Sequence, residues 1–373
     1  MNAPLPPMTA TSRARDDDVM RRVAATVRED VRALSAYHVD KAEGFIKLDA
    51  MENPFGLPPA LRERLARVLA EVEVNRYPDG AGDGVKAALA KSLPLPEGAA
   101  LVLGNGSDEL LQLLTTLVAK PGACVLAPDP SFVMYRLNAR YANLRYVGVP
   151  LRADFSLDVD ATVEAIERER PALVWIAYPN NPTGNRFARD DVERVIAAAP
   201  GIAVVDEAYY AFADDSFLPR VLAFPNLVVV RTVSKIGLAG VRLGYAVAHP
   251  AWIAEIDKVR PPYNVNALTQ AAVPVVLEHG DELARQAATL RGERARLGGA
   301  LARLAGVTVH PTETNFVLCR VPDANAWTRA LRERRILVKN LHGYHPLTAN
   351  CLRITVGTPD ENDALLAALD TLA

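Results

Sequence analysis

Lys235 lies in a stretch whose residue types are suited to chemistry on a carbonyl compound. It follows the apolar, β-branched run Leu227–Val230, at a point where a strand gives way to a loop. Desolvation in such a loop lowers the pKa of an amine, and a free amine is what Schiff-base formation requires. Thr232, Ser234 and Arg242 flank the lysine and together are suited to hold a phosphate. Pyridoxal phosphate offers both an aldehyde and a phosphate, although the stretch alone is equally compatible with a solvated surface lysine.

A glycine-rich turn follows an earlier apolar run. Leu103 precedes Gly104-Asn105-Gly106-Ser107-Asp108, and a helical pattern begins at Leu110. Ser107 or Asp108 is a good helix N-cap, and glycines such as Gly106 let the backbone approach a ligand closely. Free N–H groups at the start of a helix bind anions. The alternative is an ordinary connection between a strand and a helix, because the spacing of a dinucleotide-binding turn is absent.

Further polar or aromatic residues come directly after other apolar runs. Asp206 ends one run, and a carboxylate there is suited to keep a pyridinium nitrogen protonated, with helix capping as the alternative. Tyr209 lies three positions on and is suited to donate to a ring oxygen. Asn181 offers a donor from the turn-forming segment 178–184. Phe132 is suited either to stack on a planar ring or to lie in the core.

Arg353 lies in the strand-like run 352–356 near the C-terminus. Its planar guanidinium is suited to a two-pronged contact with a carboxylate or a phosphate. A surface salt bridge is the alternative interpretation of the same residue.

The elements that must position these residues form a repeating pattern. Short apolar runs separated by helical stretches predict βαβ units and a mostly parallel sheet, buried on both faces and flanked by helices. Ligands in such sheets bind at the carboxyl ends of the strands, so the motifs should converge on one edge. The predicted strands are 101–103, 123–126, 173–176, 202–205, 227–230 and 244–247.

The pattern changes after residue 265, which predicts an α/β fold made of a large domain and a smaller α+β domain. Residues 1–45 are expected to form an N-terminal arm and helix contributing to the small domain, residues 46–265 the large domain and residues 266–373 the small one. The first 20 or so residues are expected to be disordered or loosely attached. The C-terminal elements expected are helices 267–279, 281–304 and 361–372 and strands 307–309, 315–318 and 352–356; a helical period also covers 19–35 and a further helix 59–72.

Composition bounds the class of protein. The 373 residues are half apolar and carry a formal net charge of -2, which does not suggest a nucleic-acid partner. There is no apolar run of transmembrane length, and residues 1–22 lack the apolar core of a secretory signal. Cys124, Cys319 and Cys351 are far apart, so we expect three buried thiols, without a disulfide or a metal site. A soluble, cytoplasmic protein that binds no membrane is expected.

Taken together, these motifs resemble the fold-type I pyridoxal-phosphate aminotransferases of class I/II. The motif order matches from Asn53 to the C-terminus, and three blocks are highly specific: the Asn-Asn-Pro-Thr-Gly block at 180–184, Asp-Glu-Ala-Tyr at 206–209, and the Ser-Lys and Arg block at 234–242. Within the group, the blocks at 53–54, 75–78, 104–109 and 351–357 resemble the histidinol-phosphate aminotransferases.

The resemblance implies a role for each cofactor residue. Lys235 would bind the aldehyde and later move a proton, Asp206 would pair with the ring nitrogen, and Phe132 would stack on the ring. Tyr77 would reach the cofactor phosphate of a neighbouring subunit, which implies a homodimer with shared active sites. Lys235, Asp206 and Tyr209 form the implied catalytic set. The implied cofactor-binding set comprises Gly106, Ser107, Asp108, Phe132, Asn181, Asp206, Tyr209, Thr232, Ser234, Lys235, Arg242 and Tyr77.

The implied substrates are L-histidinol phosphate and 2-oxoglutarate, converted to imidazole-acetol phosphate and glutamate in histidine biosynthesis. Arg353 would bind the carboxylate of glutamate or 2-oxoglutarate and, in the other half-reaction, the phosphate. Tyr37, Asn53 and Lys339 complete the implied substrate set. Lys339 stands where this subfamily often has an arginine, so the charge is kept but the planar fork is lost.

Other functions share parts of this pattern. An aromatic amino-acid aminotransferase has the same fold, and a pyridoxal-phosphate decarboxylase of a phosphorylated amino acid such as threonine phosphate shares the cofactor motifs. A cofactor-binding regulator is a non-enzymatic alternative, but no helix-turn-helix segment or basic patch precedes the fold.

Overall fold

The structure, a computed structural model, describes residues 10–36 and 41–371, and of residues 10–14 only the backbone. Tyr37 therefore lies outside the described residues. The chain divides into two compact units, Met1–Lys41 and Ala42–Ala373. Both sheets lie in the second unit.

The first unit contains α1 (Ala10–Thr26) and α2 (Glu29–Arg32). The expectation of disorder is wrong for residues 10–20, which are helical, whereas loose attachment stays a prediction. The helix expected over 19–35 is present as α1 and α2, interrupted at residues 27–28. Arg21 and Arg22 both bind Asp18, three and four positions earlier, and such pairs support a helix that has little apolar surface.

The larger sheet of the second unit has seven strands in the order β2-β8-β7-β6-β5-β3-β4. All neighbours are parallel except where β8 pairs with β2 and β7. This confirms the prediction of a mostly parallel sheet. The strands are β2 (Ala100–Gly104), β3 (Cys124–Asp129), β4 (Arg145–Pro150), β5 (Leu173–Ala177), β6 (Ile202–Asp206), β7 (Leu227–Thr232) and β8 (Gly244–Ala248).

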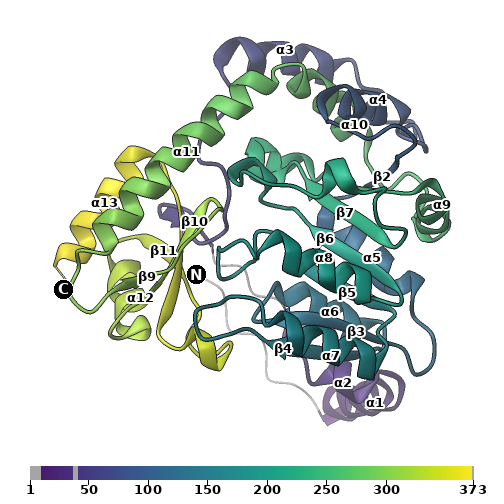
Figure 1. Cartoon of the computed structure of the whole chain (residues 1–373), viewed down its shortest axis with the longest axis horizontal. Coiled ribbons are helices and arrows are strands. Elements are labelled where there is room, and N and C mark those ends of the chain that lie inside the picture. Colours follow the sequence, from purple (N-terminus) through teal and green to yellow (C-terminus); the bar gives the residue numbers. More distant parts are fainter. Residues whose placement is uncertain (1–9, 37–40, 372–373) are drawn as a thin grey trace. The chain divides into compact units, whose positions relative to one another are not determined.

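Helices cover both faces of this sheet (Figure 1). Val174 and Ile176 belong to one core, with side chains of α7 and α8. Leu173 and Trp175 belong to another, with side chains of α5, α6 and α9. Because successive strand residues face opposite sides, burial on both faces explains the uninterrupted apolar runs. These helices are α5 (Ser107–Leu117), α6 (Val133–Tyr141), α7 (Val159–Glu169), α8 (Arg189–Ala198) and α9 (Pro250–Val259).

The smaller sheet has five strands in the order β1-β11-β12-β10-β9 and confirms the predicted α+β region. Its first strand, β1, pairs in parallel with β11, although the boundary drawn at residue 46 assigned that segment to the large domain. The elements are β1 (Ile46–Leu48), β9 (Thr308–Val309), β10 (Phe316–Arg320), β11 (Ile336–Asn340), β12 (Cys351–Thr355), α12 (Ala324–Glu333) and α13 (Pro359–Asp370).

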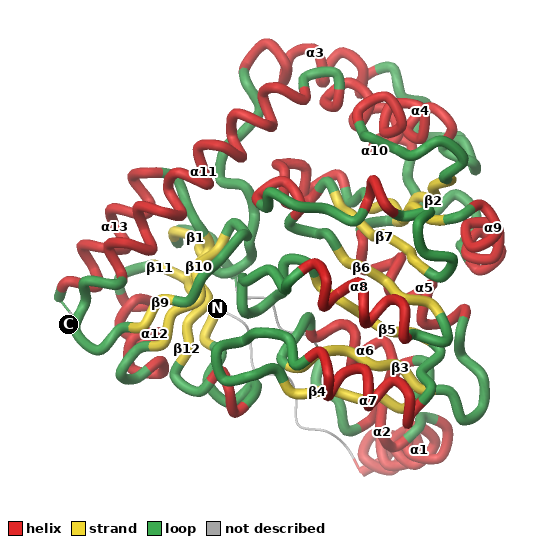
Figure 2. The backbone as a smooth tube through the Cα atoms, in the orientation of Figure 1, coloured by secondary structure: helices red, strands yellow, loops and turns green. Residues whose placement is uncertain are grey.

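The two sheets are bridged by α11 (Gly280–Leu301), which Figure 2 shows running from the region of α3 to α13. Near the start of α11, α10 (Ala267–Leu277) packs against α3 (Pro59–Ala70) and α4 (Asp83–Ser92). The domain boundary at 265/266 stays a prediction. The short helical turns are η1 (Tyr210–Phe212), η2 (Leu218–Arg220), η3 (Ser234–Leu238), η4 (Ala239–Val241) and η5 (Pro346–Thr348).

One edge of the larger sheet collects the predicted motifs. The turn after Gly104 in β2, Asp206 at the end of β6 and Thr232 at the end of β7 all lie at the carboxyl ends of parallel strands. All three cysteines are buried free thiols, as predicted. Within residues 10–36 and 41–371, no helix combines the length and apolar character needed to cross a bilayer.

Candidate active site

Lys235 lies in η3, a single π-helical turn that follows β7. Gly237 closes this turn with a φ of 118°, a conformation that favours glycine. The Nζ of Lys235 is 3.5 Å from the carbonyl oxygen of Ala50 and 6.0 Å from the centre of the Tyr209 ring. Lys235 is therefore a partly buried residue of the site rather than a solvated surface lysine.

The environment of Lys235 favours the neutral amine. Burial lowers its pKa to about 8, with a further lowering from the positive charge of Arg353. Asp108 and Glu52 act in the opposite direction, and Arg242 lowers the pKa as well. Charges from separate parts of the chain thus act on one amine.

Asp206 lies at the end of β6 and is 5% exposed. The hydroxyl of Tyr135 donates to its Oδ2 at 2.8 Å, and the N–H of Ala208 donates to Oδ1 at 3.1 Å. Burial raises the pKa of Asp206 to about 6, and the two hydrogen bonds oppose that rise. The carboxylate is held in place inside the site, as partnership with a ring nitrogen requires.

Asn181, Tyr209 and Arg353 form a connected buried set. The side-chain amide of Asn181 donates to the Tyr209 hydroxyl at 3.1 Å, and Arg353 Nη1 donates to Asn181 Oδ1 at 2.7 Å. Arg353 Nη2 donates to the carbonyl of Asp49 at 3.1 Å. Burial raises the pKa of Tyr209, so its hydroxyl stays protonated and available as a donor. Arg353 is thus part of the site and not a surface salt bridge.

The start of α5 forms one wall of an anion cradle. Gly106 has a φ of 80°, and a Cβ on it would lie 2.6 Å from Nη2 of Arg242. A Cβ on Gly244 would lie 2.5 Å from the backbone nitrogen of Ser107. Side chains at either glycine would therefore fill the cradle. Arg242 Nη2 is 3.8 Å from Oδ2 of Asp108, which places both beside the first turn of α5.

Two hydroxyls lie beside this region, because Thr232 pairs with Gly244 across β7 and β8, and Gly244 adjoins Ser107. Thr232 Oγ1 lies 2.9 Å from Ser234 Oγ and 3.0 Å from the carbonyl oxygen of Leu243, and it accepts the Ser234 N–H at 3.1 Å. Helix N–H groups, hydroxyls and a guanidinium are the donors that phosphates bind. With Lys235 for an aldehyde and Asp206 for a ring nitrogen, these donors fit pyridoxal phosphate.

Phe132 precedes α6 and is half-buried, and it packs against the core on the side of α5, α6 and α9. Its ring meets that of Tyr135 edge to face, with centres 5.7 Å apart and an angle of 88°. Because Tyr135 also binds Asp206, Phe132 lies one side chain away from the acid. This position suits a residue that stacks on a ring held by Asp206.

Lys339 and Arg353 are direct partners across β11 and β12. Residues directly opposite in an antiparallel ladder point to the same face, and like charges there repel. An anion bound between them would relieve that repulsion. The Nζ of Lys339 also lies 5.4 Å from the ring centre of Tyr344, which is mostly exposed. The structure thus brings these two predicted substrate residues together.

The structure links Asn53 to the lysine turn. Its side-chain amide donates to Gln286 Oε1 at 2.9 Å and to the Ile236 carbonyl at 3.3 Å, and its Oδ1 accepts the Phe55 N–H at 2.9 Å. These contacts hold the turn that follows Lys235. A direct contact of Asn53 with substrate stays a prediction.

Tyr77 contacts a different part of the chain. It is 81% exposed, and its ring stacks on that of Tyr263 with centres 4.6 Å apart and an angle of 17°. The structure does not bring it to the cradle within one chain, which is compatible with the predicted role toward a neighbouring subunit. Tyr37 lies outside the described residues.

Sequence reasoning missed three residues of this region: Tyr135, Gln286 and Tyr344. Tyr135 carries a usable signal, because it lies three positions after Phe132 and therefore on the same side of a helix. Gln286 has no comparable signal, since it is one polar residue within a polar helix.

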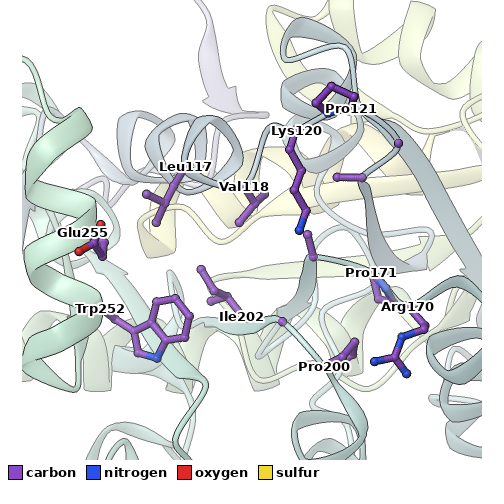
Figure 3. A pocket seen from close by; sticks show the side chains of 14 residues that line it. Leu117, Val118, Lys120, Pro121, Arg170, Pro171, Pro200, Ile202, Trp252 and Glu255 are labelled. Carbon is purple, nitrogen blue, oxygen red and sulfur yellow. The ribbon is translucent and has the colours of Figure 1, made fainter.

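A hollow of about 690 Å³ lies at the opposite edge of the larger sheet (Figure 3). Its lining includes the residues that begin or precede β3, β5 and β6, with Lys120, Arg170 and Glu255 as its charged side chains. It shares no residue with the predicted site, so the volume of a cavity does not by itself locate the chemistry.

Comparison with known families adds an independent finding. Residues 43–369 match the family described as aminotransferase class I and II. That range contains every predicted site residue except Tyr37.

Known relatives agree with this match. The chain is 58% identical over 347 residues to a histidinol-phosphate aminotransferase of Chromobacterium violaceum, covering 93% of this chain and 98% of the relative. It is 53% identical over 372 residues to histidinol-phosphate aminotransferase 1 of Ralstonia nicotianae, covering 98% and 97%. The crystal structure of histidinol-phosphate aminotransferase from Sinorhizobium meliloti in complex with pyridoxal-5'-phosphate is similar with a TM-score of 0.81 and 27% identity, covering 94% and 99%.

Proposed function

The chain belongs to the class I and II aminotransferases, and on that premise we propose that it moves the amino group of L-histidinol phosphate to 2-oxoglutarate. The products are imidazole-acetol phosphate and glutamate, as part of histidine biosynthesis. Its cofactor is pyridoxal phosphate, which suits the donors around Lys235. The observation that carries the choice of substrate is the pairing of Lys339 with Arg353 beside the lysine site.

Bound pyridoxal phosphate supplies an aldehyde for the amino group and a ring that takes up negative charge from the substrate carbon. Lys235 performs the proton transfer: its amine, with a pKa lowered to about 8, accepts the proton from the amine-bearing substrate carbon at Nζ and later returns one.

The other residues hold charge in place during the transfer. Asp206, buried at the end of β6, places a carboxylate opposite a protonated ring nitrogen. Tyr209 and Asn181 offer donors to a ring oxygen, and their mutual hydrogen bond orients both. The site is therefore arranged before the substrate arrives.

The substrate end must accept two different anions in turn. The guanidinium of Arg353 matches both a carboxylate and a phosphate, and Lys339 adds a second positive charge for the more highly charged phosphate. This explains how one site serves histidinol phosphate in one half-reaction and glutamate or 2-oxoglutarate in the other.

We also propose that two copies of the chain form a homodimer in which Tyr77 reaches the neighbouring site. The exposed stacked pair of Tyr77 and Tyr263 supports this, because large exposed aromatic surfaces mark interaction sites. A cytoplasmic location stays a prediction.

A half-reaction screen tests the proposed function. The purified protein with bound cofactor is mixed with histidinol phosphate alone, and the cofactor absorbance should change to that of its amino form. Addition of 2-oxoglutarate should then restore the original spectrum. A faster response to phenylalanine or tyrosine would favour an aromatic aminotransferase. Release of carbon dioxide from threonine phosphate, without the spectral cycle, would favour a decarboxylase.

A further inference from the structure

Tyr135, in α6, touches two of the residues that the proposed function uses, yet that function assigns it no role. It is 0% exposed. Its hydroxyl donates to Oδ2 of Asp206 at 2.8 Å, and its ring meets the edge of Phe132 with centres 5.7 Å apart. One buried side chain thus contacts both the acid and the aromatic residue predicted to hold the cofactor ring.

The ring of Tyr135 is itself held firmly. It stacks on Trp175 in β5, with centres 4.9 Å apart and an interplanar angle of 1°, and Trp175 is also fully buried. The N–H of Tyr135 donates to the carbonyl of Phe132 at 3.1 Å, which closes the turn into α6. The direction of the hydroxyl is therefore set by the sheet core and not by solvent.

The charge around Asp206 makes this hydroxyl important. Burial favours the protonated acid, and the carboxylates of Asp108 and Glu207 act in the same direction. Glu207 is itself paired with Arg231, whose Nε donates to its Oε2 at 2.9 Å. Tyr135 and the Ala208 N–H are the two donors described that favour the ionised form.

Tyr135 remains a donor throughout the working range of pH. Its own burial, together with the charge of Asp206, raises the pKa of the phenol well above its usual value. A donor that does not ionise gives Asp206 a constant partner, so the orientation of the carboxylate does not depend on solvent.

We propose that Tyr135 is a positioning residue for the transamination: its hydroxyl holds the Asp206 carboxylate toward the cofactor ring nitrogen, and its ring supports Phe132. This rests on the proposed function, because it assumes that pyridoxal phosphate is bound at Asp206. In this role Tyr135 acts through Asp206 and Phe132 and does not contact the substrate.

Tyr178 provides a matched control for Tyr135→Phe. It too is 0% exposed, and its hydroxyl donates to a carboxylate, Oδ2 of Asp215, at 2.6 Å. Its ring packs edge to face on Phe217, with centres 5.1 Å apart. This hydrogen bond is partly buried, and the hydroxyl also accepts from Nη1 of Arg186 at 3.1 Å. Tyr178→Phe therefore removes a tyrosine–carboxylate hydrogen bond but leaves both donors to the Asp206 carboxylate in place.

The experiment compares two ligands on the cofactor-free full-length protein. The dissociation constants of pyridoxal phosphate and of its carbocyclic analogue, in which C–H replaces the ring nitrogen, are measured by fluorescence for wild type and both variants. Wild type should prefer pyridoxal phosphate. Because a hydrogen bond to a charged group is lost, Tyr135→Phe should reduce this preference by about tenfold, whereas Tyr178→Phe should leave it within about twofold.

A merely structural role would weaken both ligands equally, so an unchanged preference in Tyr135→Phe overturns the proposal. Turnover supplies a second readout: kcat should fall by about tenfold while the KM for histidinol phosphate stays within about twofold. If Tyr135→Phe does not fold, Trp175→Phe is used instead, because it weakens the stacking that holds the Tyr135 ring. This variant must also reduce the preference for pyridoxal phosphate over the analogue. If the wild type binds both ligands equally and shows no half-reaction with histidinol phosphate, the proposed function itself is wrong. That outcome differs from one in which the wild type prefers pyridoxal phosphate and only the effect of Tyr135→Phe is absent.

Discussion

The cofactor end and the substrate end of the site are built in different ways. At the cofactor end, the polar groups find their partners inside the protein: Tyr135 binds Asp206, and Asn181 binds Tyr209. At the substrate end, Lys339 and Arg353 are opposite each other in a sheet, with the same charge. The polar groups of the first region are paired without substrate, whereas we propose that an anion binds between the two positive charges of the second.

A hydrogen bond connects the two regions. Arg353 donates from Nη1 to Asn181, whose amide in turn binds Tyr209. The positive charge of Arg353 also lowers the pKa of Lys235. We infer that the cofactor chemistry depends on a preformed cluster of residues. Under the proposed function, an anion bound at Arg353 would act on this cluster through Asn181 and Lys235.

The largest expected effect comes from a change at the cofactor end. Lys235→Ala removes the amine that attaches the aldehyde and moves the proton, so turnover should fall at least about a thousandfold with every amino donor. Borohydride reduction followed by mass spectrometry should find the cofactor attached to wild type and absent from the variant. Lys339→Ala, at the substrate end, is the control and should retain the attachment. Wild-type turnover in Lys235→Ala would remove the basis of the mechanism.

The burial of Asp206 predicts a pH dependence of the cofactor-free protein. Its folded pKa of about 6 is above the unfolded value, so the folded state binds more protons between the two, and stability should fall as pH rises from about 4 to about 6. The Asp206→Asn variant cannot titrate at this position. Compared with it, the wild type should lose about 3 kcal/mol of its free energy of unfolding over this range, and the loss should level off above pH 6. Denaturant unfolding at a series of pH values measures this difference. Parallel curves for the two proteins would contradict the assignment of the buried charge.

Arg353→Lys tests the link between the regions. Lysine keeps the charge but loses the fork, so the KM values for both histidinol phosphate and glutamate should rise by about thirtyfold, with a smaller change in kcat. Steady-state kinetics of each half-substrate measures this. An effect confined to glutamate would show that Arg353 does not serve both anions.

The sequence predicted the cofactor end because its physical signals are local. Apolar runs buried on both faces identified the strands, and polar residues such as Asp206 and Lys235 followed them directly in the chain. Strand β4 was missed because it is an edge strand, in which only Val149 is buried and no continuous apolar run exists.

Contacts between distant segments were not predictable in the same way. The hydrogen bond of Tyr135 joins residues 71 positions apart, and the polar Gln286 reaches Asn53 across 233 positions. The register that sets Lys339 opposite Arg353 requires strand β11, which the sequence analysis did not identify. Such pairings depend on how elements pack, which a local pattern does not encode.

The smallest expected effect comes from Lys339, because its partly exposed charge is screened by solvent and supplements Arg353. Lys339→Ala should raise the KM for histidinol phosphate by about tenfold but that for glutamate by only about twofold, since the phosphate carries more charge than a carboxylate. Lys339→Arg, which restores a planar fork, should keep both KM values within about twofold of wild type. Steady-state kinetics of the two variants measures the ratio of the KM for histidinol phosphate to the KM for glutamate. Equal increases for both substrates in Lys339→Ala would mean that its charge acts on the whole site and does not select the phosphate, so the distinction between the two ends would then rest on Arg353 alone.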